Sequence, residues 1–294
     1  LVKHKIKRAW RFVANERVEP THVMRAAVGR LLRRRFKGKK PLIVSFDWTK
    51  VRTVPTLMAA AVVQGRAIPL CWGCYADRTL GKSQNALEEA LLLVLREMIP
   101  PGLKVILLAD RGFGRTELAR FCQRYGFSYV IRISANVWIQ AQGFAGKLAD
   151  YPLEKGMCRR LPNVQYRKTG PILQHLVLRW KKNLPAQKDE PWYLMTDLEG
   201  RALDISQLYA RRFQIEEFFR DAKSSQFGWA LEKTRITRPD RLERLLLVLV
   251  LAYLLLIGLG LHARAHYASG RWCASNRPNE CSADCPFRGD GVQD

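Results

Sequence analysis

Apolar runs separated by turn residues divide the first half of the chain into strands and helices. Runs at Pro41–Thr49, Thr56–Gln64 and Arg66–Tyr75 predict three strands, joined as an antiparallel meander by a tight turn at residues 64–65. The next four elements alternate between helix and strand, at Ala86–Met98, Leu103–Asp110, Arg115–Tyr125 and Ser128–Ile133. This order of β-β-β-α-β-α-β predicts an α/β protein with a mixed sheet flanked by helices.

Between Ile133 and Ser206 the pattern changes to short alternating runs with many turn residues. Strands are expected at Val137–Gln140, Leu173–Trp180 and Trp192–Thr196. We interpret residues 134–205 as a mostly β insertion that precedes the next long helix.

A single amphipathic helix is predicted over residues 208–223, which contain neither Gly nor Pro. At 100° per residue, a stripe about 60° wide collects four polar residues, Tyr209, Arg212, Glu216 and Lys223. Glu217 falls about 100° away from Glu216 and is expected to have a structural role. The helix alone also fits an ordinary surface helix with an Arg212–Glu216 pair at i, i+4.

A second long helix is predicted at Leu245–Leu261, where 17 consecutive residues carry no charge. A buried helix crossing the back of a sheet has this pattern, and so does a membrane span, although about 20 residues are needed to cross a bilayer. We expect the helix to be protein core, and Leu251→Arg to unfold the domain.

The charge of the chain indicates a polyanionic partner. The 294 residues are 48% hydrophobic, which is enough for a substantial core, and they carry a net charge of +24 with a pI near 10.2. Residues 1–40 contain 14 Lys and Arg against Glu16 and Glu19, and they read as helix-rich, with a helix start at Pro20. Nucleic acid is the simplest partner for this charge, and an anionic membrane surface also fits it.

The seven cysteines are odd in number and irregularly spaced, which favours a reducing cytoplasm over a disulfide framework. Cys71 and Cys74 have zinc or redox spacing but lie in a strand-like run without a second pair. The cysteines and histidines near the C-terminus match no ligand pattern: His262, His266, Cys273, Cys281 and Cys285. The first residues show no signal peptide, and the missing initial Met suggests a truncated reading frame.

The spacing Y-x2-R-x3-E-x6-K, filled by Tyr209, Arg212, Glu216 and Lys223, resembles the signature of the DDE transposases of bacterial insertion sequences. That family also has one Asp at the end of an early strand and another at the end of a later strand. Asp47 and Asp110 are in these positions. The resemblance covers roughly residues 40 to 260, and it implies an RNase H-like catalytic core, which is also the fold of the predicted element order.

The resemblance implies a metal triad of Asp47, Asp110 and Glu216 that holds two Mg²⁺ ions, which Mn²⁺ can replace. Carboxylates suit such hard cations, and a pair of ions supplies both an activated oxygen nucleophile and a stabilised leaving oxygen. The two aspartates would be neighbours if their strands are adjacent and parallel.

The resemblance also implies DNA-binding residues around the triad. Arg212 and Lys223 would bind phosphates near the cleaved bond, and Tyr209 would offer a hydroxyl to a phosphate oxygen. Arg111, directly after Asp110, is a further candidate. A Trp in the insertion is expected to stack on a base flipped out of the DNA end, and Trp192 fits best, with Trp138 and Trp180 as rivals.

The predicted function is a DNA transposase that cleaves transposon ends by metal-dependent hydrolysis and transfers the 3′-hydroxyl into target DNA. Its partners would be the terminal inverted repeats, target DNA and a second copy in a synaptic homodimer, without a membrane, in the bacterial cytoplasm at the nucleoid. The alternatives are a catalytically inactive or truncated transposase-derived DNA-binding protein, or a membrane-anchored basic protein. We divide the chain into a basic helical segment that includes a truncated DNA-binding region (1–40), a first core part (41–133), the insertion (134–205), C-terminal core helices (206–264) and a polar, disordered tail (265–294).

Overall fold

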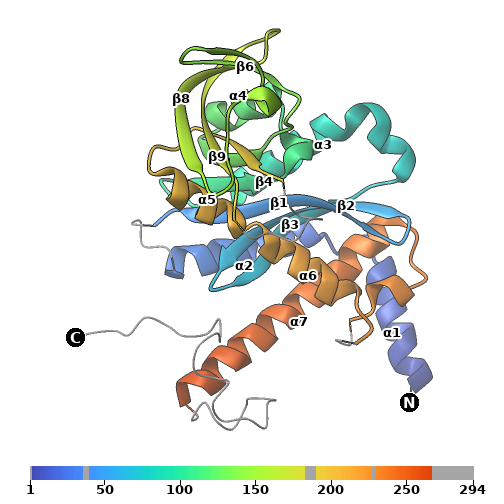
Figure 1. The fold of residues 1–294 in the computed structure, drawn as a ribbon. Helices are drawn as coiled ribbons and strands as arrows, with labels where there is room; N and C mark the ends of the chain where they lie inside the picture. Colours follow the sequence, from blue (N-terminus) through green and yellow to red (C-terminus); the bar gives the residue numbers. More distant parts are fainter. Residues whose placement is uncertain (1, 36–39, 183–189, 227–228, 267–294) are drawn as a thin grey trace.

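The protein is built around one mixed sheet of ten strands, in the order β3-β2-β1-β4-β5-β10-β9-β8-β6-β7 (Figure 1). The computed structural model describes residues 2–35, 40–182, 190–226 and 229–266. The strands are β1 (Leu42–Val51), β2 (Val54–Val63), β3 (Arg66–Cys74), β4 (Val105–Ala109), β5 (Phe127–Arg132), β6 (Trp138–Ala141), β7 (Phe144–Lys147), β8 (Cys158–Tyr166), β9 (Ile172–Arg179) and β10 (Trp192–Thr196). The α-helices are α1 (Val2–Ala14), α2 (Pro20–Arg35), α3 (Leu80–Met98), α4 (Thr116–Arg124), α5 (Ala202–Ala210), α6 (Phe213–Lys223) and α7 (Pro239–His266).

The first five strands follow the order predicted along the chain. β1, β2 and β3 form an antiparallel meander, and β4 and β5 then run parallel to β1. The backbone turns between β2 and β3 with positive φ at Gln64 and Gly65, which gives the tight turn expected at this position. The α/β, RNase H-like architecture predicted from the sequence is confirmed.

The strands of residues 134–205 extend the same sheet. β10 pairs antiparallel with β5, and β9, β8, β6 and β7 follow it outward. The predicted strands of this segment are present as β6, β9 and β10, whereas β7 and β8 were not predicted. β8 contains Pro162 and Asn163 at an irregularity in its pairing with β9, and such turn residues hide a strand from pattern analysis.

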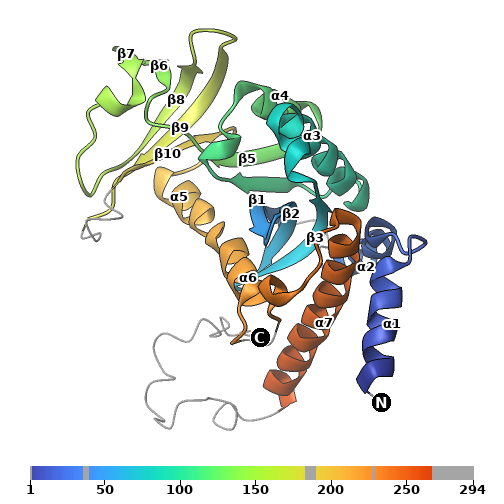
Figure 2. The same ribbon diagram turned by 90° about the vertical axis from the view of Figure 1, so that its right-hand side faces the viewer.

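Helices pack on both faces of the sheet (Figure 2). α5 packs on one face against Ile106 and Leu108 of β4 and Val130 of β5. α3 and α4 belong to the larger core, which includes Leu107 on the opposite face of β4. Because alternate strand residues point to opposite faces, β1 presents Asp47 to the side of α6 and Trp48 to the side of α3.

The single helix predicted over 208–223 is wrong, because the chain forms two helices with a turn at residues 211–212. The Arg211 and Arg212 amides donate to the carbonyls of Leu208 and Tyr209 three residues back, at 3.1 and 2.9 Å. Both residues keep negative, helical φ and ψ, so the turn is a local 3₁₀ tightening and not a glycine or proline break. The cause is tertiary: α5 packs on β5, β8 and β9, whereas α6 packs on β1, β2 and β3.

The prediction that Leu245–Leu261 is protein core holds only for its first part. Leu246, Leu247 and Val250 of α7 are at most 2% exposed. Tyr253 and Leu254 still pack against the core, and the C-terminal part of the helix then extends away from the body, with exposed residues that include Leu255 at 69% (Figures 1 and 2). Leu251 itself is 37% exposed, so the burial on which the expectation for Leu251→Arg rests is absent.

α7 is long and apolar enough to cross a membrane by length and composition alone. In this fold, however, its N-terminal half is fixed inside the protein, since Glu243 accepts a hydrogen bond from the Cys74 amide at 2.8 Å and Arg244 donates to the Val13 carbonyl at 3.0 Å. The apolar stretch beyond the core contacts, from Leu255 to Leu261, rises about 10 Å, roughly a third of a hydrocarbon core. The helix therefore cannot span a bilayer without leaving the core.

The basic N-terminal segment forms α1 and α2, with α2 beginning at Pro20 as predicted. α2 packs beside the edge strand β3 and also touches α3 and α7. The predicted tail of residues 265–294 begins inside α7, which continues to His266; residues 36–39 and 267–294, with the three cysteines of the tail, lie outside the described residues.

Candidate active site

Asp47 and Asp110 lie side by side in the middle of the sheet because β1 and β4 are adjacent and parallel. Phe46 pairs with Ala109 at the end of the β1–β4 ladder, so the two aspartates occupy the next position on each strand. The predicted neighbourhood of the two acids is thus a direct result of strand register. Contrary to the sequence-based expectation, Asp47 does not end its strand, since β1 continues to Val51 alongside β2.

Asp110 begins the loop that follows β4. Its carboxylate accepts a hydrogen bond from the Gly112 amide at 2.9 Å and caps the short 3₁₀ helix of residues 111–113. An added Cβ at Gly112 would lie 3.2 Å from Asp110 Oδ1, so a side chain there would crowd the acid. The glycine allows this loop to bend tightly around the carboxylate.

Glu216 reaches the site from α6 and is tied to Asp47 by Arg212. The guanidinium donates to Asp47 Oδ2 at 3.1 Å and to Glu216 Oε1 at 2.5 Å. The Arg212 side chain is only 7% exposed and lies beside the rings of Tyr209 and Phe213, at 5.9 and 4.9 Å from their centroids. A buried cation therefore holds the acid on the strand and the acid on the helix together.

The electrostatics of Asp47 are those of a crowded, desolvated acid. The pKa of Asp47 is raised from its ordinary 3.8 to about 7, mainly by burial; the carboxylates of Asp110 and Glu216 also raise it, whereas Arg212 lowers it. Asp47 is thus within electrostatic reach of both other predicted acids. An acid so perturbed is typical of a functional site.

Tyr209 and Lys223 occupy different surroundings, although both were predicted to contact phosphates. Tyr209 is 1% exposed, belongs to the core under α5, and has a pKa raised by burial and lowered by Arg212. Lys223 donates to the Thr49 hydroxyl at 2.7 Å, and burial lowers its pKa. Thr49 is two residues beyond Asp47 and shares its face of β1, so Lys223 lies on the acid side of the sheet.

Trp192 adjoins the site through aromatic contacts. Its ring centroid lies 5.3 Å from that of Tyr209 and 6.1 Å from that of Phe213, and the Lys181 ammonium is 4.8 Å from it. Phe213 is 40% exposed and was not identified from the sequence, although it directly follows Arg212. The rival Trp138 starts β6 near the far edge of the sheet and contacts Lys168, whereas Trp180 directly follows β9 and contacts Lys155.

Arg132 is a site residue that sequence reasoning missed. β5 runs parallel to β4 with Ile131 opposite Ala109, so Arg132 occupies the position beside Asp110. Its guanidinium pairs with Glu190 at 2.5 Å, and Glu190 also lies 3.9 Å from Arg111. The available signal was its place at the end of a third parallel strand. The predicted Arg111 is 61% exposed in the same cluster.

Glu217 points away from the acids, as helix geometry predicted. Its charge raises the pKa of Tyr253 on α7, and it is not among the groups that perturb Asp47. Glu216 and Glu217 thus have different neighbours despite being adjacent in sequence.

Cys71 and Cys74 form no metal or redox centre that the described residues support. Both thiols are buried free cysteines, and desolvation raises the pKa of Cys71 to about 12 and that of Cys74 still higher. Since thiolates are the reactive and metal-binding form, these side chains are packing residues of β3.

The donor set around Asp47 suits a divalent cation of the Mg²⁺ type, because it consists of carboxylate oxygens that repel one another. Within the described ranges, no three His, Cys, Asp or Glu side chains are grouped closely enough to hold a metal ion. The Arg212 guanidinium bridges Asp47 and Glu216 and neutralises part of their charge. The oxygen donors suit the ion by type, the three carboxylates are not gathered around one point in this arrangement, and the triad stays a prediction.

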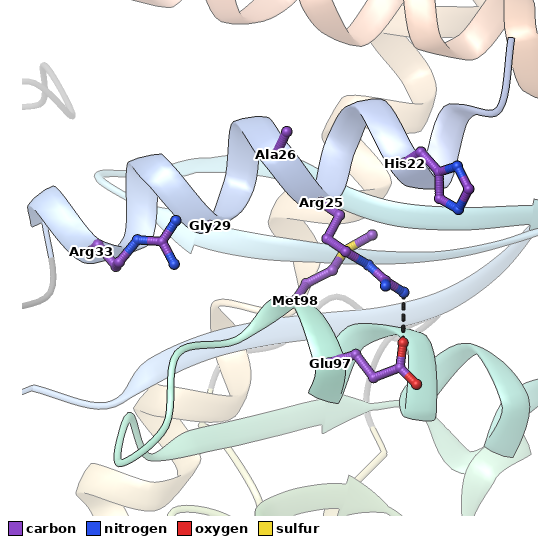
Figure 3. Close-up of a pocket in the computed structure, with 7 residues that line it drawn as sticks. All are labelled: His22, Arg25, Ala26, Gly29, Arg33, Glu97 and Met98. Atoms are coloured by element: carbon purple, nitrogen blue, oxygen red, sulfur yellow. Dashed lines mark hydrogen bonds and ion pairs between the residues drawn. The ribbon is translucent and has the colours of Figure 1, made fainter.

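One cavity lies away from these acids, between α2 and the C-terminal end of α3 (Figure 3). It has a volume of about 380 Å³, and Arg25 crosses it to pair with Glu97 at 2.6 Å. Its other lining residues are His22, Ala26, Gly29, Arg33 and Met98. With one carboxylate, already paired, this cavity lacks the acids that the chemistry needs.

Comparison with known proteins agrees with the geometry. The family model described as "Transposase DDE domain" matches residues 38–255, which is more than half of the chain. The matched range contains all three acids together with Arg212 and Lys223. No curated protein matches the chain.

Proposed function

Since the chain belongs to the family of DDE transposases, we propose that it cleaves DNA at the ends of a mobile element and joins the freed 3′-hydroxyl to target DNA. The family acts on DNA and generally uses divalent metal ions. The observation that carries the proposal is the arrangement of acids: Asp47 and Asp110 on neighbouring parallel strands, with Glu216 linked to Asp47 through Arg212.

Asp47, Asp110 and Glu216 would hold the metal ions. When bound, two Mg²⁺ or Mn²⁺ ions supply an activated oxygen nucleophile and stabilise the leaving oxygen of an in-line displacement. The acids must be ionised to act as ligands, so the raised pKa of Asp47 implies that metal binding releases a proton near neutral pH.

Several cations on the acid side of the sheet would bind DNA phosphates. Arg212 has its Nε hydrogen unpaired in a buried position, and Arg111 and Arg132 lie beside Asp110 and share Glu190. Lys223 extends the positive surface along β1 toward Thr49. Phosphates entering this surface would replace carboxylates as partners of these side chains, and such contacts are charge-assisted.

Trp192 and Phe213 would provide the aromatic surface for an unstacked base. The rings lie 6.1 Å apart and are tilted by 31°, and Phe213 is exposed. Lys181, next to the Trp192 ring, would add a cation near the phosphates of that nucleotide. Stacking on such side chains contributes about 1–3 kcal/mol per base and tolerates any sequence.

The proposed function also gives a role to each segment of the chain. The basic segment of residues 1–40 would add phosphate contacts, and two copies would assemble with two DNA ends in the cytoplasm at the nucleoid. Residues 41–133 and 206–264 would form the catalytic core, and residues 134–205 would carry the base-stacking surface.

Cleavage of labelled DNA tests the proposal. A duplex carrying the inverted repeat that flanks the gene is incubated with the protein and either Mg²⁺, Mn²⁺ or EDTA. We expect cleavage at the repeat end that depends on the metal and leaves a free 3′-hydroxyl. Salt-sensitive DNA binding without cleavage in either metal would instead identify a catalytically inactive DNA-binding protein.

A further inference from the structure

A buried carboxylate behind the active site contacts both segments that carry the aspartates. Glu88 on α3 is 1% exposed and lies on the face of the sheet opposite Asp47. Its Oε1 accepts hydrogen bonds from Trp48 Nε1 at 2.8 Å and from Gln84 Nε2 at 3.1 Å, and its Oε2 pairs with the Arg115 guanidinium. Glu88 takes no part in the chemistry proposed above.

The first contact of Glu88 leads to Asp47. Trp48 is the next residue on β1, and its backbone amide donates to Asp47 Oδ1 at 2.9 Å. The Trp48 ring also packs against Tyr75, with 5.7 Å between the centroids. The indole is therefore held at both ends, and the strand residue beside the acid cannot shift without breaking the bond to Glu88.

The second contact leads to Asp110. Asp110 lies in a loop, and the strand register that fixes Asp47 ends one residue before it. Arg115 closes this loop at the start of α4, and Phe113 within the loop packs on Phe46, with 5.1 Å between the rings. Glu88 and Phe46 thus hold the loop from beneath, while Asp110 faces the other side.

Stability alone does not explain this buried ion pair. Arg115 is 8% exposed, and its Nε and Nη2 atoms find no hydrogen-bond partner among the described residues. Buried ion pairs of this kind are often no better for stability than apolar residues of the same size, because desolvation costs as much as the attraction gains. A geometric role accounts for the charge where a stability role does not.

We propose that Glu88 is a positioning residue that fixes the distance between Asp47 and Asp110 by binding Trp48 and Arg115 at the same carboxylate. The proposal rests on the proposed function, since it gives the two aspartates a shared metal to hold. Outer groups that orient metal ligands typically change metal affinity or activity by about 10- to 100-fold when they are removed.

The test compares Glu88→Gln with Glu89→Gln. Glutamine keeps the shape of Glu88 and loses the charge that Arg115 requires. Glu89 is its neighbour, is 34% exposed at the side chain and lies 3.8 Å from Arg115, so it serves as the matched control. Two readouts are independent of catalysis: Mn²⁺ affinity by calorimetry, and amide exchange of the peptide that covers residues 110–115.

We expect Glu88→Gln to weaken Mn²⁺ binding by about tenfold or more and to accelerate exchange in residues 110–115, with Glu89→Gln within about twofold of the parent. Unchanged affinity and exchange in Glu88→Gln would overturn the proposal. If that variant does not fold, Trp48→Phe removes only the indole bond and should still weaken Mn²⁺ binding several-fold. An unaltered Mn²⁺ affinity in Trp48→Phe would then count against it.

A double variant separates positioning from stability. Glu88→Leu/Arg115→Met replaces the pair with apolar side chains and should recover the thermal midpoint without recovering Mn²⁺ affinity. Recovery of both would show that the pair serves stability only. If the parent protein binds Mn²⁺ as expected but cleaves no DNA, the proposed transposase activity fails and the positioning role remains measurable.

Discussion

The strand-borne acids and the helix-borne acid are held in the site by different means. Asp47 has a side chain that is 13% exposed, and its backbone is fixed by ladders to β2 and β4. The Glu216 side chain is 47% exposed and belongs to α6, an amphipathic helix that follows the 3₁₀ turn. It is linked to Asp47 through the Arg212 guanidinium. Sheet register fixes the first position, whereas side-chain contacts set the second.

This difference indicates which part of the site can move. The pair of Asp47 and Asp110 has no alternative register, because slipping β4 by one residue would turn its buried residues to the wrong face. The turn at residues 211–212 gives α6 a place to pivot, and 3₁₀ segments within helices often mark such hinges. We therefore expect Glu216 to adjust when a metal or DNA displaces Arg212.

The largest effect is expected from the acids on the strands. Asp47→Asn and Asp110→Asn should each reduce metal-dependent cleavage by more than about a hundredfold, since each removes a charged oxygen ligand. DNA affinity, measured by fluorescence anisotropy, should change less than about threefold because the cations are intact. Residual cleavage above a tenth of the parent rate by either variant would remove that acid from the metal site.

The role of Glu216 is tested by comparing the cleavage rates of the Glu216→Gln and Glu217→Gln variants. The first substitution removes a charge that faces Asp47 and should lower the cleavage rate by about a hundredfold. The second changes a charge that faces Tyr253 and should alter the rate only a few-fold. Rates come from single-turnover cleavage of the same duplex. The opposite order would mean that α6 presents the wrong face to the site.

Lys223→Ala should weaken DNA binding about tenfold, since a charge-assisted hydrogen bond contributes about 1.5–3 kcal/mol. The slope of log K against log salt should fall by about 0.9, which corresponds to one duplex phosphate. Lys50→Ala is a control, because this exposed lysine on β1 already pairs with Asp77. Equal losses for both variants would show a diffuse positive surface in place of a defined phosphate contact.

The smallest effect concerns the stability of the metal-free protein. The folded pKa of Asp47 lies near 7, above its ordinary 3.8, so folding favours the protonated form and wild-type stability falls as pH rises from about 4 to about 7. The Asp47→Asn variant has no carboxyl at this position and should not lose stability in this way as the pH rises. Its thermal midpoint in EDTA should exceed that of the wild type by a few degrees at pH 8 and by less at pH 5. A constant difference across this range would contradict the raised pKa.

The sequence predicted the parts of the fold that depend on local pattern and order. Strands β1 to β5 and the neighbourhood of Asp47 and Asp110 follow from apolar runs and parallel pairing, which short segments encode. Glu216 was separated from Glu217 by helix periodicity alone.

The parts that could not be predicted depend on tertiary contacts. Residues 208–223 have uniform helix propensity, and the turn at Arg211 arises because α5 and α6 pack on different strands. The apolar run of α7 is uniform too, so it does not show that burial ends near Val250. Glu88 and Arg132 carry no motif, and their roles appear only when α3 and β5 are placed beside the aspartates.

The most direct measurement is the anomalous scattering of Mn²⁺ in crystals of the protein bound to a cleaved DNA end. We predict Mn²⁺ peaks between the carboxylates of Asp47 and Asp110, with Glu216 as a ligand and Arg212 shifted to a phosphate. Peaks that lie away from Asp47 and Asp110, or that are unchanged in crystals of the Asp110→Asn variant, would contradict a metal site built on these two strands.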